Sequence, residues 1–583
     1  MQTLTIENYS EVANVASTIS MKWFEWNSYK EPAGSLWSEI DKYIHGTDTN
    51  STLNTGTDHN TMIPVVSEIH NDLNAIMYST ILPHEDWLGW QGYDIESVTK
   101  TKREKVLSYI KHIHRVNNFR PTMRKVIDDY HRYGNCFAKV YYKDTTTVNE
   151  KGVPVSGYAG ACIERISPFD IVFNPTANSF YNTGKIIRSL MSLGEFKGWI
   201  DSLPEDLNVD MAKMEGVLDR RSSGGRNDYS NRRKEAQYIP DGFGSIEQYL
   251  MSDFIEVLTY YGDVYDVNSK TVYKNRCIAI VDRDCLIFDK EETGVRVFKG
   301  SFKQRPDNLW AQGALDNVVG INYMINHREN AKNDAIDRFA HPDRLYVGDV
   351  EEIYDDVTGQ TKYLVPEGGS VSDITPDSTV LSYNNEIALH LDLARRASGL
   401  PPQISGFRTA GEKTAFEVQN LNEGAFRSFI NSAEQFEQEF LEPLITAEIE
   451  IAKENFTSVI KVLEEDEEGI FTTLQVTEDD LKSNGKLVPY GARRFERQLQ
   501  QQAGIQQLSQ SQLGQLVAPH MNSWQLTQAV NFLYGLSDFD IFGKFAATEE
   551  QLEQQKITAR AEEDFMMDRS QPSMAELELG EEL

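Results

Sequence analysis

Cysteine, long apolar runs and positive charge are all scarce in this sequence. Its 583 residues include four cysteines, Cys136, Cys162, Cys277 and Cys285. They are too few and too scattered for a disulfide framework or a zinc site, and they fit a reducing cytoplasm. No stretch approaches the roughly 20 apolar residues of a membrane-spanning helix, so we expect no membrane partner. Glu7 and Glu11 precede the first cation, Lys22, so we expect no signal peptide.

Basic residues are outnumbered by acidic residues. The chain has 57 Lys and Arg against 89 Asp and Glu, a formal net charge of -32. A protein that grips DNA neutralises phosphates with cations, so we do not expect strong nucleic-acid binding over the whole surface. The hydrophobic content of 40%, with 27 Phe and 26 Tyr, indicates a folded protein rather than a disordered one. The length predicts about four modules.

The stretch from Gln304 to Phe456 is the most informative. Pro306 disfavours helix just before it, and the proline-free segment Leu309 to Ala340 predicts a helical rod of roughly 48 Å. Its apolar stripe is narrow, and five asparagines lie between the apolar positions: Asn317, Asn322, Asn326, Asn330 and Asn333. We therefore expect this helix to be stabilised by copies of itself or by other helices alongside.

The same stretch continues with an insert and two further helices. His341-Pro342 ends the rod, and residues 343–383 are predicted to form a small β-rich insert with Pro and Gly turns. Residues 384–398 are predicted to be helical again. After a loop, apolar residues at helical spacing from Val418 to Leu444 predict a long helix, which Pro443 should bend rather than end.

This order of rod, insert, returning rod, loop and long helix resembles that of tailed-bacteriophage portal proteins (head-to-tail connectors), particularly the short-tailed-phage type. Arg305-Pro306-Asp307-Asn308-Leu309-Trp310, through Gly313-Ala314-Leu315-Asp316-Asn317, resembles the family's lead-in to the first stem helix. Tyr133-Gly134-Asn135-Cys136-Phe137 resembles part of the N-terminal wing. The resemblance spans roughly residues 60 to 540, and it is carried by the order and length of elements rather than by catalytic motifs.

The resemblance implies an α+β portal fold with an α/β wing, a long-helix stem, a small α/β clip and a helical crown, assembled as a ring-shaped homo-oligomer. The implied parts are the wing (1–303), first stem helix (304–340), clip (341–383), second stem helix (384–400), tunnel loop (401–413), long wing helix (414–456), wing β-hairpin (457–488), crown (489–547) and an acidic C-terminal tail (548–583).

The function implied by this resemblance is that of a DNA channel at one capsid vertex. Its implied partners are itself in a ring of about twelve subunits, the major capsid protein, scaffold, the terminase large subunit, head-tail adaptor and tail proteins, and double-stranded DNA. The implied location is the virion, with assembly in the host cytoplasm. The acidic composition suits a conduit, because a neutral or acidic wall lets DNA move without sticking. The ordinary alternative is that the charge only confers solubility.

Candidate contact residues follow from the same comparison. In the tunnel loop, Arg408, Thr409 and Lys413 would face the channel, unless the segment is an ordinary linker. In the clip, an acidic, partner-facing edge is expected at Asp349, Glu351, Glu352, Asp355 and Asp356. In the wing, a basic loop that would contact DNA or a capsid subunit, or remain solvated, contains Arg220, Arg221, Arg226, Arg232, Arg233 and Lys234.

The wing itself is predicted from helical and then strand-like periods. Helices are expected at 11–29, 62–82, 104–117 and 121–133, and strands at 137–143, 161–166, 171–173, 254–261, 272–281, 285–288 and 295–298. Two of these helices carry many cations, which form either a local basic patch or a solvated face: Lys102, Arg103, Lys105, Lys111, Arg115, Arg120, Arg124, Lys125 and Arg132.

Motifs for catalysis, nucleotides and metals do not match. The segment Gly406 to Thr414 approaches a phosphate-binding loop, but Glu412 occupies the position of the lysine. His112 and His114 point to different faces of their helix, and the acidic clip residues lack calcium-loop spacing. We therefore expect no cofactor, no metal and no enzyme activity. Two alternatives stay open: another virion structural protein, such as a scaffold, internal or tail component, or a nucleic-acid-processing enzyme.

Overall fold

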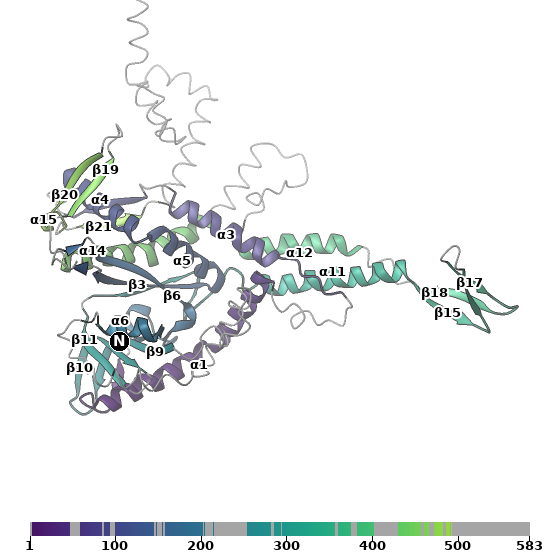
Figure 1. Ribbon diagram of the computed structural model, residues 1–583, viewed down its shortest axis with the longest axis horizontal. Coiled ribbons are helices and arrows are strands. Elements are labelled where there is room, and N and C mark those ends of the chain that lie inside the picture. Colours follow the sequence, from purple (N-terminus) through teal and green to yellow (C-terminus); the bar gives the residue numbers. More distant parts are fainter. Residues whose placement is uncertain are drawn as a thin grey trace, which may run out of the picture. The chain divides into compact units, whose positions relative to one another are not determined.

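The computed structural model describes most of the chain up to residue 491. The described residues are 3–46, 59–83, 87–93, 100–144, 147–148, 154–155, 158–201, 203, 214, 254–281, 285–292, 294–355, 360–374, 382–400, 429–455, 460–465, 471–481, 485–489 and 491. They form a mixed α+β structure, as the sequence predicted (Figure 1).

The largest sheet has six strands in the order β11-β10-β9-β8-β7, with β1 paired in parallel to β9. The strands are β1 (Leu4–Ile6), β7 (Ile171–Phe173), β8 (Lys185–Ser192), β9 (Phe254–Asp266), β10 (Thr271–Val281) and β11 (Cys285–Glu291). Successive side chains point to opposite faces, so Leu258 and Val257 enter different clusters. Helix α1 (Val12–His45) covers one face with Trp23, and α6 (Leu193–Asp201) covers the other with Phe196.

A second, three-stranded sheet, β12-β3-β6, shares its core with the helices around it. The elements of this layer are α3 (Val65–Ile81), α4 (Lys100–Val116), α5 (Phe119–Tyr133), β3 (Asn135–Asp144), β6 (Ala159–Ile166), β12 (Val297–Ser301) and α14 (Glu442–Glu454). Tyr130 of α5 and Phe436 meet edge to face with ring centroids 4.9 Å apart. This contact joins two segments that lie some three hundred residues apart in sequence.

The structure also contains several short strands and helices. They are β2 (Leu88–Gly92) paired with β21 (Gly485–Pro489), β4 (Thr147–Val148) with β5 (Pro154–Val155), and β19 (Ile460–Glu465) with β20 (Phe471–Val476), together with η2 (Pro168–Asp170), η3 (Phe180–Asn182) and α15 (Glu478–Leu481). Within the segment 457–488, where a β-hairpin was predicted, β19 and β20 form that hairpin. The seven predicted strands of the wing are confirmed as well.

The long helix continues past Pro443, as predicted, but through a π-helical turn, η7 (Glu437–Leu441), that directly precedes α14. Proline has no N–H, so Pro443 cannot donate to the carbonyl of Glu439 one turn earlier. The hydroxyl of Tyr181 donates to that carbonyl instead, at 3.1 Å. The sequence predicted the disturbance, and a distant tyrosine compensates for it.

The first stem helix is shorter than predicted. Helix α11 runs from Val318 to Ala340, whereas Asn308–Gln312 forms strand β14, paired with β13 (Lys303–Arg305). The prediction of a helix from Leu309 is therefore wrong at its start, and 23 residues give a rod of about 34 Å.

Tertiary contacts explain why the lead-in to α11 is extended. The side chain of Asn135 donates to the carbonyl of Ala311 and accepts from its N–H, both at 3.0 Å. Trp310 stacks on Phe173 with centroids 4.3 Å apart. Gly134, at φ +68°, lets the backbone of Gln312 approach so closely that a Cβ there would lie 2.4 Å from a backbone atom. These contacts require an exposed backbone edge, which a helix would not offer.

The remaining predictions for this region are confirmed or extended. Helix α12 (Tyr383–Ser398) agrees with the predicted second stem helix. The insert contains four strands, β15 (Asp343–Val347), β16 (Glu351–Asp355), β17 (Gln360–Leu364) and β18 (Ser370–Ile374), and its described residues include no helix, in contrast to the α/β clip expected. Helix α1 passes through Pro32 and ends at His45, well beyond the predicted end near Tyr29.

Candidate functional site

The insert between α11 and α12 consists of two antiparallel hairpin-like pairs, β15–β18 and β16–β17. The two pairs meet where the rings of Tyr346 and Tyr363 approach to 5.8 Å and the guanidinium of Arg344 lies 4.7 Å from the Tyr363 ring centroid. The Tyr346 hydroxyl also donates to Glu352. Of these side chains, Arg344, Tyr346 and Glu352 are exposed and Tyr363 is half-buried.

Large apolar side chains of the insert lie on its surface. Tyr354 is 66% exposed, and the other exposed members are Leu345, Tyr346, Val347, Ile353, Leu364, Val365 and Ile374. Every residue of β15 is exposed. A two-stranded sheet without a hydrophobic face is marginally stable in water, so the insert has the composition of a surface that is covered in its working state.

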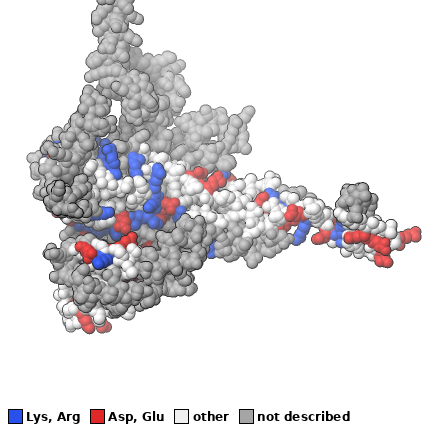
Figure 2. Space-filling model, in the orientation of Figure 1, with Lys and Arg blue, Asp and Glu red and all other residues white. Residues whose placement is uncertain are grey.

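Acidic side chains accompany these apolar residues. Asp349, Glu351 and Glu352 are exposed, as the sequence predicted, and Asp355 lies at the end of β16. Asp356 lies outside the described residues. Figure 2 shows that Asp and Glu dominate the insert, with few basic residues among them. The acidic edge expected from the sequence is therefore present on the described part of the insert.

Helices α11 and α12 pack side by side in antiparallel directions (Figure 1). Arg328 pairs with Glu386 at 2.8 Å, and Lys332 donates to Asn384 at 3.2 Å. Later residues of α11 therefore contact earlier residues of α12, as antiparallel helices require. Ile325 and Ile387 are buried in the cluster shared with α3. On the outside, Leu389 is 68% exposed and Leu393 is 52% exposed, one turn apart on the same side of α12.

Three asparagines of α11 are buried, and they hold a segment from elsewhere in the same chain. Asn322, Asn326 and Asn330 together with Asp334, spaced four residues apart, form what we call the asparagine ladder. It binds the strap, residues 59–63. Oδ1 of Asn326 accepts from the N–H of Ile63 at 2.9 Å, and Oδ1 of Asn330 accepts from that of Thr61 at 2.8 Å.

At both ends of the ladder, too, a side-chain oxygen accepts from a backbone N–H. The N–H of His59 donates to Asp334 at 2.9 Å, and its ring nitrogens lie 2.6 Å from Asp334 and 3.2 Å from Asp337. At the other end, Asn322 accepts from the N–H of Val66 at 3.1 Å and donates to the carbonyl of Ile63 at 3.2 Å. Val66 lies in the first turn of α3, where backbone N–H groups lack helical partners, so Asn322 caps that helix.

The ladder side chains and the strap N–H groups are spaced by nearly the same distance. Four residues of an α-helix rise about 6.0 Å, and two residues of an extended chain advance about 6.6 Å, so every second strap N–H meets a ladder side chain. The expectation that another helix lies alongside α11 is confirmed by α12. The expected polar side facing water is corrected at these asparagines, because a segment of the same chain covers them.

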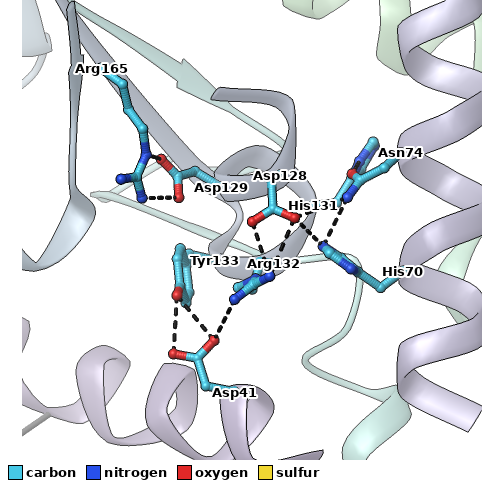
Figure 3. Close-up of polar contacts among 9 residues, drawn as sticks. All are labelled: Asp41, His70, Asn74, Asp128, Asp129, His131, Arg132, Tyr133 and Arg165. Atoms are coloured by element: carbon cyan, nitrogen blue, oxygen red, sulfur yellow. Dashed lines mark hydrogen bonds and ion pairs between the residues drawn. The ribbon is translucent and has the colours of Figure 1, made fainter. Parts of the chain in front are cut away.

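A second buried polar network joins α1, α3, α5 and β6 (Figure 3). The Tyr133 hydroxyl donates to both oxygens of Asp41 at 3.0 Å, and Arg132 bridges Asp41 at 3.2 Å and Asp128 at 3.1 Å. Arg165 holds Asp129 through two nitrogens at 2.5 and 2.6 Å. The carboxylates thus all have positively charged or hydroxyl partners.

Histidines close this network on the side of α3. His70 lies 3.0 Å from Asp128, and Asn74 lies 2.7 Å from Nδ1 of His131. Burial, with the nearby His70, lowers the pKa of His131 to about 3, so this imidazole is neutral at ordinary pH. Burial raises the pKa of Asp128, but the hydrogen bond from His70 and the charge of Arg132 outweigh it and hold that pKa at about 2. The network fastens helices together, and sequence analysis missed it.

The cations predicted to form a basic patch have several partners inside the chain. Lys105 pairs with Asp480 at 2.8 Å, Arg132 belongs to the network above, and the Arg124 guanidinium lies 4.5 Å from the ring centroid of Tyr78. Figure 2 nevertheless shows Lys and Arg gathered on the part of this face that contains α4 and α5. His114, which we expected to form no site, is 9% exposed, lies 2.8 Å from Glu448 and stacks on Phe119.

Several predicted contact residues lie outside the described residues. They are the tunnel-loop residues Arg408, Thr409 and Lys413, the basic loop of Arg220, Arg221, Arg226, Arg232, Arg233 and Lys234, nearly all of the crown, and the C-terminal tail. These predictions remain predictions.

Metal, membrane and disulfide features were searched over the described part of the chain. Within it, no group of three or more His, Cys, Asp and Glu is arranged to hold a metal ion. No described helix is long and apolar enough to cross a bilayer. All four cysteines, which are described, are free thiols. Comparison of the sequence with models of known protein families gives no match, and comparison with curated protein sequences gives none either.

Proposed function

We propose that this protein is a portal protein of the tailed-bacteriophage type. About twelve copies would close into a ring by cyclic symmetry at one capsid vertex. Double-stranded DNA would pass through the ring when a docked terminase packages the genome and again when the genome is ejected, and the adaptor and tail proteins would attach to the same ring. In this proposal the protein hydrolyses nothing itself.

The observation that carries the proposal is the insert at the junction of α11 and α12. Its hairpins expose large apolar side chains such as Tyr354 and Leu364 without a core of their own. Such residues on one chain are expected to be covered by neighbouring subunits and by docking proteins, because contiguous exposed apolar surface marks interaction sites. The implied clip occupies this position in the order of elements.

The outer side of α12 supports the same proposal. Leu389 and Leu393 form an exposed apolar patch on α12. Charged residues lie beside it, such as Asp392 and Arg396, which form an ion pair with each other. A helix face of this kind suits contact with the stem of the next subunit. In the proposed channel, the acidic composition of the chain favours passage of DNA over binding of DNA.

Electron microscopy of the purified full-length protein in negative stain tests the proposal directly. The expected result is annular particles with a central hole, and native mass spectrometry gives the number of copies. Protein that stays a folded single subunit at every concentration would contradict the proposal. Assays of ATP hydrolysis and DNA cleavage on the same preparation test the enzyme alternative, which turnover abolished by replacing one carboxylate would favour.

A variant at the outer face of α12 tests the role of the stem. Leu389→Asp places a charge in the proposed interface, where burying it is unfavourable by several kcal/mol, so rings should dissociate while the subunit stays folded. Met21→Asp is the matched control, because Met21 of α1 is 67% exposed, nearly as much as Leu389. The control should form rings normally. Equal ring formation by both variants would remove α12 from the interface.

A further inference from the structure

A pocket of about 230 Å³ lies beside the start of β8. The residues that matter for its chemistry are Thr183, Lys185, Asp263, Arg276, Glu292 and Arg296. None of them belongs to the insert, to the asparagine ladder or to the network of Figure 3, and the proposed function gives the pocket no role.

The backbone explains why two polar side chains point into this pocket. Gly184 packs against the ring of Tyr260 so tightly that a Cβ there would lie 2.6 Å from the tyrosine oxygen. Alternate residues of an extended chain point to opposite sides, so Thr183 and Lys185 face away from Tyr260 and line the pocket together.

An irregularity in the neighbouring strands opens the space. The register of β10 against β9 shifts between Tyr273 and Arg276, and Asn275 in this bulge has φ +50°. The N–H of Asn275 donates to the Asp263 carboxylate at 2.9 Å. Bulges of this kind redirect side chains and are frequent beside binding sites.

Lys185 is the cation of this pocket that lacks a counter-ion. Its side chain belongs to a residue only 6% exposed, and among the described residues no carboxylate lies within ion-pair distance of its ammonium group. The ammonium instead lies 4.8 Å from the centroid of the Phe180 ring. Burial lowers the pKa of Lys185 to about 8 while the charge of Asp263 opposes this shift, so the group is mostly cationic at pH 7.

The other charged residues of the pocket already have partners. Arg276 pairs with Asp289 at 2.6 Å, and Arg296 pairs with Glu292 at 3.2 Å and with Glu454 at 2.9 Å. Next to Lys185, the hydroxyl oxygen of Thr183 is buried and has no hydrogen-bond partner within the described part of the chain. The pocket thus presents one positive charge that has no ion-pair partner among the described residues, with Asp263 acting on it only from a longer distance, and one hydroxyl without a hydrogen-bond partner there, two positions apart on one extended segment.

We propose that this pocket binds a small oxyanion, phosphate or a short carboxylate, which accepts hydrogen bonds from the ammonium of Lys185 and the hydroxyl of Thr183. A buried charge without a partner is unfavourable, and charge-assisted hydrogen bonds to an anion are among the strongest that proteins make. The volume accommodates an ion of this size together with water. A bound ion would supply the missing negative charge and satisfy both groups at once.

Calorimetric titration of the full-length protein with inorganic phosphate, and separately with acetate, at constant ionic strength tests the site. Lys185→Met and Thr183→Val keep the side-chain volume and remove the two polar groups, and each should weaken binding about tenfold or more, as expected for a hydrogen bond to a charged group. Lys299→Met is the matched control, because Lys299 is also buried but donates to Ser301. The control should bind as the unaltered protein does, and the ratio of the two dissociation constants assigns the preferred oxyanion.

Two results would overturn the proposal: no binding of either anion at millimolar concentration, or binding that Lys185→Met leaves unchanged. A second measurement avoids variants that fail to fold. Trace acetylation of the unaltered protein, followed by peptide mass spectrometry, should show that the preferred anion slows modification of Lys185 and leaves the partly exposed Lys22 unaffected. Equal rates at Lys185 with and without the anion would also refute the site.

Discussion

The asparagine ladder can be tested by removing its members one at a time. Asn322→Ala deletes an acceptor for the N–H of Val66 and a donor to the carbonyl of Ile63, and both groups are then left buried without that partner. The carbonyl of Ile63 still accepts from the N–H of Val65 at 2.9 Å, so only the N–H of Val66 is left unsatisfied, and this variant should lose about 1–3 kcal/mol locally. Asn326→Ala deletes one acceptor, and the amide nitrogen of Asn326 has no partner among the described residues, so about 1–2 kcal/mol is expected.

Amide hydrogen exchange is the appropriate assay, because it reports local opening rather than a single global transition. At about 1.4 kcal/mol for each factor of ten, Asn322→Ala should accelerate exchange of the strap and of the first turn of α3 about fivefold to about a hundredfold. Exchange in the six-stranded sheet should not change. The measurement therefore separates release of the strap from general loss of stability.

Asn333→Ala provides the control for this experiment. Asn333 lies on the same helix but outside the ladder, and alanine there should favour the helix slightly. If Asn333→Ala and Asn322→Ala accelerated strap exchange equally, or if neither did, the ladder would not be what holds residues 59–63 against α11.

Three further predictions concern the wing. Lys30→Met should destabilise the α1 side of the large sheet by about 3 kcal/mol or more in denaturant unfolding, because the buried ammonium donates to the carbonyls of Pro168, Phe169 and Ile171 at 2.7–3.3 Å. The control Lys22→Met, at a partly exposed lysine of the same helix, should change little. Tyr181→Phe should cost about 1 kcal/mol, since it leaves the Glu439 carbonyl without its replacement donor, and exchange near η7 should accelerate. The pKa of His131 is about 3 in the folded state, below the usual 6.5, so the stability contributed by the neutral imidazole is complete above pH 6.5 and is lost as the pH falls toward 3. His131→Gln should therefore flatten the dependence of unfolding free energy on pH between 6.5 and 3. An unchanged dependence would contradict this role of His131.

Periodicity predicted the elements of the wing because local patterning decides them. Strands such as β9 and β10 alternate side chains into two buried clusters, and α5 begins just before Pro121, where a missing N–H is tolerated. The start of α11 was predicted wrongly because no local signal shows that Asn135 hydrogen-bonds the backbone of Ala311. Contacts between distant segments override helix propensity there.

The candidate sites also differ in how far local sequence predicts them. The exposed acidic insert was predictable, because charge and turn residues are local properties of the sequence. The ladder left a visible signal, three asparagines and an aspartate spaced four apart, but its partner at residues 59–63 carries no recognisable pattern. The network around Asp41 and Arg132 left only isolated i, i+4 pairs such as His70 with Asn74 and Asp128 with Arg132. Sequence spacing indicates that such side chains share a helix face, but not what faces them.

Because of the ladder, assembly of a ring must depend on residues other than the buried asparagines of α11. The polar character of α11 first suggested that this helix needs copies of itself or other helices alongside, yet within one chain α12 packs against it and the strap covers Asn322, Asn326 and Asn330. The case for assembly therefore rests on side chains that remain open, Leu389 and Leu393 on α12 and the apolar residues of the insert. Loss of a ladder residue should loosen the single subunit, whereas loss of Leu389 should affect only assembly. Because the two sets of residues are distinct, folding and ring closure can be disrupted separately in this protein.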